Sequence, residues 1–231
     1  MRRLILTSMI KLTCLSLVLG SGVGSALAAA ENEPYRRPFP HWKELTTEAY
    51  SGSPQGRQEK LVDALNEAKT LAQIDGYPQS ECLFELGALA VEQNKLEAAQ
   101  KNFEEAKALK EKALGILWTR ECFDKGEKLG YLPAYSNPEQ ELHGKRHDLA
   151  NCLGWLGDVY LKESHTAEAA TTYSQSIKVM EANGPETEAI IFPEVLLKYA
   201  RTLRLLGRAN EARQVEERAK QFLAKRQLLD K

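Results

Sequence analysis

Residues 153–173 read LGWLGDVYLKESHTAEAATTY, and this stretch specifies the architecture of the chain. Its first half carries one helical stripe of apolar and small residues, namely Leu153, Leu156, Gly157 and Tyr160. Its second half carries the small Ala169 and the aromatic Tyr173. A glycine inside a helix costs up to about 1 kcal/mol relative to alanine, so Gly157 requires a packing reason. We therefore predict a helical hairpin whose two helices approach closely at Gly157.

The same order of residue types occurs twice more along the chain. Residues 83–106 read LFELGALAVEQNKLEAAQKNFEEA, with Leu86-Gly87 as the large-small pair. Residues 196–219 have Tyr199-Ala200 as this pair, and Glu216 where the other copies have an aromatic residue. One hairpin cannot bury its apolar stripe alone, so such units stack in a row. The sequence therefore predicts an all-α array of helical hairpins.

This pattern resembles the tetratricopeptide repeat (TPR), a helix-turn-helix unit of about 34 residues. The interval between the second and third copies is longer and is similar to kinesin-light-chain-like repeats, with Gly184-Pro185 in the extended joint. The resemblance implies an α/α superhelical solenoid of about three to four TPR-like hairpins. It also implies a scaffold that binds a protein or peptide through its concave groove.

The beginning of the chain has the features of a secretory signal peptide. Arg2, Arg3 and Lys11 precede a short apolar stretch at 12–24, and an A-x-A signal ends at Ala28. We therefore expect export to the periplasm or the extracellular space. The expected organisation is a signal peptide at 1–28, a linker at 29–40, a degenerate repeat at 41–74, a repeat at 80–112, an irregular insert at 113–146, a repeat at 147–181, and a repeat at 193–229 with a C-terminal capping helix.

Removal of a leader would leave three cysteines, Cys82, Cys122 and Cys152. They form no C-x-x-C motif, and an odd number leaves at least one thiol without an intramolecular partner. We expect all three to be small packing residues, with a disulfide as the alternative.

Several classes of function find no support in the sequence. The net charge of −1 shows no basic excess for nucleic acid, and no second apolar segment is long enough to span a membrane. Neither G-x-S-x-G nor H-E-x-x-H occurs, so we predict no enzyme and no cofactor. His143 and His147 have metal-ligand spacing for a helix, but Gly144 favours a loop at His143, and we predict no metal site.

The TPR resemblance implies which residues line the groove, because the family uses the same four positions in each first helix. Carried over residue by residue, these positions are Glu81, Phe84, Ala88 and Val91, then Asn151, Gly154, Asp158 and Leu161, then Glu194, Leu197, Arg201 and Arg204. The candidate partner-binding residues among them are Phe84, Ala88, Val91, Asn151, Asp158, Leu161, Leu197, Arg201 and Arg204. Arg201 and Arg204 could pair with carboxylates of a partner, or face solvent and bind nothing.

Two alternatives remain open at the level of sequence. The apolar-aromatic stretch at 130–138, together with the histidines up to residue 147, could form a small-ligand or metal site. The chain could also be an architectural subunit that self-associates into a homo-oligomer through the ends of its solenoid.

Overall fold

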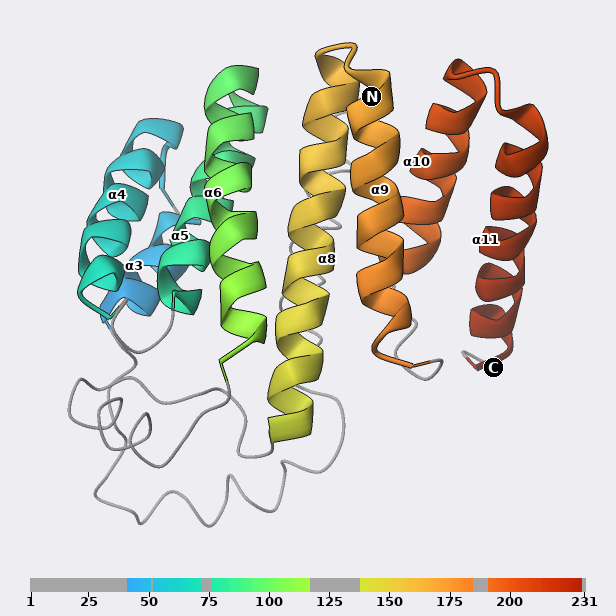
Figure 1. Ribbon diagram of the computed structural model, residues 1–231. Coiled ribbons are helices and arrows are strands. Elements are labelled where there is room, and N and C mark those ends of the chain that lie inside the picture. Colours follow the sequence, from blue (N-terminus) through green and yellow to red (C-terminus); the bar gives the residue numbers. More distant parts are fainter. Residues whose placement is uncertain (1–40, 51, 72–75, 117–137, 185–190, 230–231) are drawn as a thin grey trace. The chain divides into compact units, whose positions relative to one another are not determined.

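The structure is a computed structural model that describes residues 41–50, 52–71, 76–116, 138–184 and 191–229 (Figure 1). The predicted signal peptide, the linker, Cys122 and most of the predicted insert lie outside the described residues. Within the described part of the chain there are eight helices and no strand. The all-α prediction is therefore confirmed.

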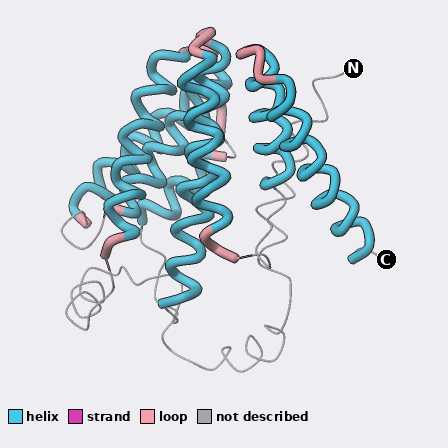
Figure 2. Tube along the Cα trace, turned by 45° about the vertical axis from the view of Figure 1, so that its right-hand side comes forward, coloured by secondary structure: helices cyan, strands magenta, loops and turns pink. Residues whose placement is uncertain are grey.

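The eight helices form four consecutive TPR-like hairpins (Figures 1 and 2). The first pairs α3 (His41–Ala49) with α4 (Pro54–Thr70), and the second pairs α5 (Tyr77–Glu92) with α6 (Leu96–Leu114). The third pairs α8 (Pro138–Lys162) with α9 (Thr166–Glu181), and the fourth pairs α10 (Ile191–Leu205) with α11 (Ala209–Leu229). The second helix of each hairpin packs against the first helix of the next, through the pairs α4 with α5, α6 with α8, and α9 with α10.

Three of the four hairpins close with the same turn. A left-handed residue stands in each turn, with φ of 58° at Asn94, 66° at Ser164 and 75° at Gly207. The next residue donates its backbone N–H to a carbonyl at the end of the first helix, in the pairs Lys95 to Ala90 (2.8 Å), His165 to Tyr160 (2.8 Å) and Arg208 to Leu203 (2.9 Å). This recurrence of one backbone geometry supports the reading of the three segments as copies of one unit.

The glycine of the large-small pair is required by an aromatic ring of the second helix. A Cβ atom at Gly157 would lie 2.7 Å from the ring of Tyr173, and one at Gly87 would lie 2.7 Å from the ring of Phe103. Both rings are fully buried. The fourth hairpin has Ala200 at this place and Glu216 where the ring would be, so the extra methyl group is accommodated there.

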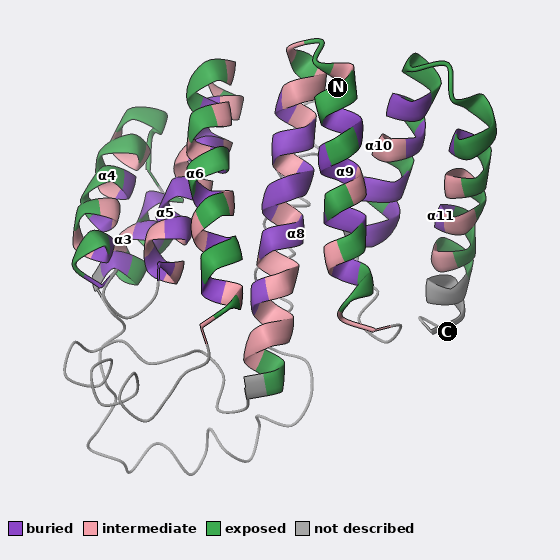
Figure 3. Ribbon diagram, viewed as in Figure 1, coloured by how far each residue is buried: buried purple, intermediate pink, exposed green. Residues whose placement is uncertain are grey.

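Clusters of buried residues connect the last three hairpins. One cluster of buried residues joins α5, α6 and α8, and a second joins α8, α9, α10 and α11. Figure 3 shows buried residues on α8, α9 and α10, whereas the first turns of α8 are mostly intermediate or exposed. No helix within the described ranges is both long enough and apolar enough to cross a bilayer.

One local prediction is wrong. The sequence predicts a loop at His143 because Gly144 follows it, and an irregular segment up to residue 146. Helix α8 instead begins at Pro138 and contains both residues. Its early part is anchored by contacts to other helices, including the bond from Asn183 Nδ2 to the carbonyl of His143 (3.1 Å) and the contact of Lys145 Nζ with the carbonyl of Ala113 (3.4 Å).

Two glycines of α8 provide a matched test of this packing. We expect Gly157→Ala to lower the free energy of unfolding by about 1–3 kcal/mol, because its methyl group would overlap the ring of Tyr173. Gly154→Ala should leave it unchanged or raise it by up to about 1 kcal/mol, because the nearest atom, in Val195, would be 3.5 Å away. Urea unfolding of both variants measures the difference, and equal effects would contradict the close approach at Gly157.

Candidate functional site

The first helices of the last three hairpins, α5, α8 and α10, share one face, on which their side chains contact one another. We call this surface the first-helix face and define it by Tyr77, Glu81, Phe84, Glu85, Asp148, Trp155, Asp158, Glu194, Leu197, Lys198 and Arg201. The ring of Phe84 contacts that of Trp155, which joins α5 to α8. The carboxylate of Asp158 binds Lys198, which joins α8 to α10. The candidate residues from the sequence thus come from helices that are neighbours in space.

Most of the apolar candidates are half-buried and rest on the core. Phe84, Ala88 and Val91 of α5 pack against the buried cluster beneath them, and Leu161 of α8 packs against the next cluster. Leu197 differs, because 44% of its surface is exposed. Asn151 is half-buried. The apolar part of the face is therefore continuous with the core, and Leu197 is its most exposed member.

An aromatic group of three rings, Phe84, Phe103 and Trp155, occupies the joint between α5 and α8. The Phe84 and Trp155 rings are 6.3 Å apart and meet edge to face, and the Phe103 ring is 5.6 Å from Phe84 and 6.1 Å from Trp155. Phe103 is fully buried, whereas Phe84 and Trp155 are half-buried. The two partly exposed rings are therefore held in place from below by the third.

A polar node of Asp158, Tyr173, Lys198 and Glu194 occupies the corresponding joint between α8 and α10. The Tyr173 hydroxyl donates to Asp158 Oδ1 (2.5 Å), and Lys198 Nζ contacts Asp158 Oδ2 (2.7 Å) and Glu194 Oε1 (3.0 Å). Burial opposes the charged form of Lys198, but Asp158 and Glu194 outweigh it and raise the pKa of this amine. In the repeat register, Ala88, Phe103 and Trp155 stand where this node has Asp158, Tyr173 and Lys198. One joint of the face is thus apolar and the next is polar.

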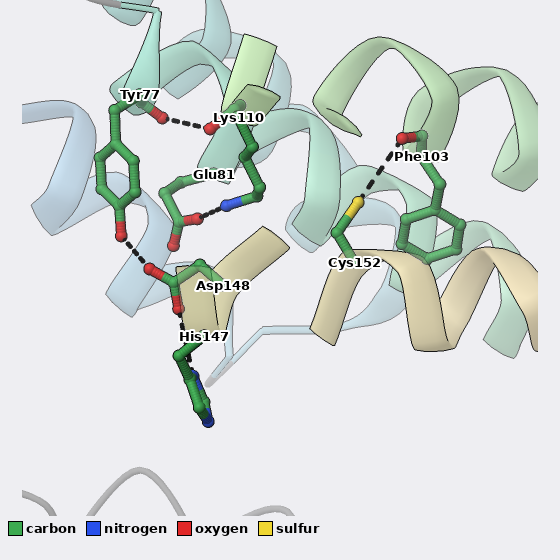
Figure 4. A network of polar contacts seen from close by, with 8 residues as sticks. Tyr77, Glu81, Phe103, Lys110, His147, Asp148 and Cys152 are labelled. Carbon is green, nitrogen blue, oxygen red and sulfur yellow. Dashed lines mark hydrogen bonds and ion pairs between the residues drawn. The ribbon is translucent and has the colours of Figure 1, made fainter. Parts of the chain in front are cut away.

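A charged cluster lies beside the aromatic group, where α5, α6 and α8 meet (Figure 4). The amine of Lys110, only 2% exposed, binds Glu81, and the hydroxyl of Tyr77 binds Asp148. His147 Nδ1 lies 3.6 Å from Asp148, and the Lys110 amine lies 5.1 Å from the centre of the Tyr77 ring. Figure 4 shows the side chains of Tyr77, Glu81, Lys110 and Asp148 converging from the three helices, with the His147 ring directed away below them.

The electrostatics of this cluster follow from one buried cation among several carboxylates. Burial opposes the charged form of Lys110, but Glu81 and Asp148 outweigh it and raise its pKa. Burial raises the pKa of Glu81, and the Lys110 charge offsets this only in part. Burial likewise opposes ionisation of Asp148, but its contacts with His147, Lys110 and Tyr77 hold its pKa below the usual value.

Glu85, one turn after Glu81 on α5, has a strongly perturbed carboxyl group. Burial raises its pKa to about 7, although hydrogen bonding by Tyr50 and the charges of Arg57 and Lys110 act in the opposite direction. The guanidinium of Arg57 is itself bound to Glu92 at 2.8 Å. The carboxylate of Glu85 therefore lacks a cation dedicated to it among the described residues.

The two arginines singled out from the sequence lie in different settings. Arg204 is bound by both oxygens of Glu216 within its own hairpin, with Nη2 and Oε2 at 2.7 Å. Arg201 is exposed, and we find no ion pair for it among the described residues. Of the two, Arg201 alone presents a cation that its own hairpin does not engage.

The structure places Cys82 and Cys152 in packing roles. Cys82 and Cys152 are free and buried, as predicted, and Cys152 Sγ lies 3.5 Å from the carbonyl of Phe103. Burial raises the pKa of both thiols to about 12. In the described part of the chain, no three His, Cys, Asp or Glu side chains are grouped so that they could hold a metal ion.

Several residues of the face were not predicted. Glu85, Trp155 and Lys198 each follow, by one residue, a position that the TPR resemblance implies. Their positions correspond across the three hairpins, so the repeat register already contained the signal. Lys110 and Asp148 could not be found in this way, because their approach to Glu81 depends on how α6 and α8 cross α5.

Comparison with known proteins identifies related arrangements only among solved structures. No protein-family model matches the chain, and no curated protein matches it. BtubC (BKLC) from P. vanneervenii is 14% identical, covers 89% of this chain and 88% of its own, and superposes with a TM-score of 0.40.

Two crystal structures of a kinesin light chain protein of Podosopora anserina with nearly identical TPR-like repeats are each 17% identical to this chain. They cover 80% and 84% of this chain and 94% and 99% of their own, both with a TM-score of 0.35. Similarity at this level does not bear on what this chain binds.

The raised pKa of Glu85 predicts a specific pH dependence of stability. Between the ordinary value of 4.5 and about 7, the folded chain holds a proton that the unfolded chain has lost. The free energy of unfolding therefore falls as pH rises through this window. We expect Glu85→Gln to remove this decline, so that the free energy of unfolding of the variant relative to that of the parent rises by up to about 3 kcal/mol between pH 4.5 and pH 8. Urea unfolding at both pH values measures it.

Glu97→Gln, at an exposed site in the first turn of α6, is the control. It should follow the pH profile of the parent. A Glu85→Gln variant that declined with pH as steeply as the parent would show that Glu85 does not hold the proton.

Proposed function

We propose that this chain is a non-enzymatic protein-interaction module that binds a protein or peptide partner across the first-helix face. The observation that carries the proposal is the partial exposure of three apolar side chains, Phe84, Trp155 and Leu197. Each of them comes from a different hairpin. Phe84 and Trp155 are supported from below by Phe103, so little side-chain entropy would be lost when a partner covers them.

The stacked hairpins favour this use of the face. Repeat arrays present extended surfaces to which several units each contribute side chains. Partly exposed aromatic residues are prominent among those that contribute most to binding at protein interfaces. The outer helix α11, by contrast, is rich in charged residues and suits a capping role at the end of the array.

Site-specific photo-crosslinking tests this proposal. A photoreactive phenylalanine analogue in place of Leu197 should give a discrete adduct when the mature chain is exposed to its native cell extract. The same analogue in place of Gln175, an exposed residue of α9, should give none. Adducts of equal yield from both positions, or none from Leu197, would contradict binding through the first-helix face.

The proposal also includes export, which rests on the leader-like sequence at 1–28. We expect the chain to be cleaved after Ala28 and recovered outside the cytoplasm. Mass spectrometry of the protein from its own cells measures its first residue. A chain that begins at Ala29 supports export, and a full-length chain recovered from the cytoplasm contradicts it.

A further inference from the structure

The apolar part of the first-helix face forms a strip that crosses the helices. Phe84 lies on α5, Trp155 on α8 and Leu197 on α10, and these three helices belong to consecutive hairpins. Phe84 and Trp155 are in ring contact and half-buried, and Leu197 is 44% exposed. A ligand that covers all three must therefore extend across the first helices and carry apolar groups along its length.

The charges beside this strip are unevenly distributed. The buried amine of Lys110 lies 5.9 Å from the centre of the Phe84 ring and is surrounded by the carboxyl groups of Glu81 and Asp148, and Glu85 directly follows Phe84 on α5. The exposed Lys43 on α3 acts on Glu81 more weakly than Lys110 does. Further along, near Leu197, the charges of the polar node and of Arg201 balance. Three carboxyl groups thus face the two cations Lys110 and Lys43, so the surplus on this part of the face is one negative charge when Glu85 is ionised.

A partner rich in carboxylates would find few available cations on this face. Lys198 is bound by Asp158 and Glu194, and Arg204 is bound by Glu216. Arg201 alone among the predicted groove residues offers an exposed cation. An acidic segment that lay along the strip would also meet the carboxylates next to the aromatic rings, where like charges repel.

We propose that the partner contributes a linear segment that combines apolar side chains with lysine or arginine, the apolar groups covering Phe84, Trp155 and Leu197 and the cations lying beside Glu85 and Glu81. This inference rests on the proposed function and adds the chemistry of the partner to it. Charge-assisted contacts of this kind give specificity to an interface whose affinity comes from apolar burial.

Glu85 is the carboxylate best suited to receive such a cation. Glu81 already binds Lys110, and Asp148 already binds Tyr77, whereas Glu85 is hydrogen bonded by a phenol and forms no ion pair within the described ranges. The groups that act on it are Tyr50 after α3, Arg57 on α4, Glu81 on α5 and Lys110 on α6. A lysine from the partner would favour the ionised form of Glu85, so binding should release a proton and strengthen as pH rises through about 7.

Three short peptides of equal length serve as probes of this inference. All carry leucine at alternate positions, with lysine, glutamate or serine between the leucines. Titration of the mature chain by isothermal calorimetry at low ionic strength measures each affinity. We expect the lysine peptide to bind about tenfold more tightly than the glutamate peptide, which corresponds to about 1.4 kcal/mol. Its affinity should fall as salt is added and as pH is lowered from 8 to 5.5.

Glu85→Gln is the variant that isolates the carboxylate. It should lower the affinity for the lysine peptide about threefold to tenfold and leave the affinity for the serine peptide unchanged. Replacement of Glu81 is unsuitable, because it would leave the buried Lys110 amine without its carboxylate. Trp155→Ala should lower the affinities for the lysine and serine peptides, and Glu97→Gln, at an exposed site, should change neither affinity. Circular dichroism confirms that each variant is folded.

Equal or tighter binding of the glutamate peptide would overturn the inference, as would a lysine peptide indifferent to Glu85→Gln or the absence of binding by all three peptides. These outcomes are distinct from failure of the proposed function. If the probe at Leu197 captures a partner but the peptides favour glutamate, the binding face stands and the partner chemistry is wrong. If the probe captures nothing, the binding face itself is wrong.

Discussion

The close contact between a glycine of the first helix and an aromatic ring of the second is the interaction on which the array depends. It sets how near the helices of a hairpin approach, at Gly87 against Phe103 and at Gly157 against Tyr173. The same rings reach the first-helix face, because Phe103 supports Phe84 and Trp155, and the Tyr173 hydroxyl binds Asp158. Packing within a hairpin thus positions the side chains available to a partner.

A second constraint is the buried amine of Lys110. Its charge is stable inside the array only because Glu81 and Asp148 surround it, and removal of one partner from a buried ion pair is costly. The role of these two carboxylates is therefore to stabilise the buried charge of Lys110. Glu85 lies on the same helix as Glu81 and forms no ion pair among the residues that the structure describes, so its carboxyl group can respond to a ligand or to pH.

The fold could be predicted from the sequence because each helical hairpin is specified by the spacing of residues that are close together in the chain. Leu156, Gly157 and Tyr173 lie within one unit, and the TPR resemblance predicts that Phe84, Asp158 and Leu197 lie on one face. Side-chain contacts between helices, and the helical conformation next to Gly144, could not be inferred in this way. The binding of Arg204 by Glu216, the helical conformation of His143, and the approach of Lys110 to Glu81 each depend on tertiary geometry rather than on spacing.

Side-chain footprinting by hydroxyl radicals, with and without the captured partner, tests the central claim most directly. The account predicts that oxidation of Phe84, Trp155 and Leu197 falls when the partner binds, while exposed residues of α6, α9 and α11 such as Leu223 keep their reactivity. Protection confined to those second helices, with the three first-helix residues unchanged, would contradict it.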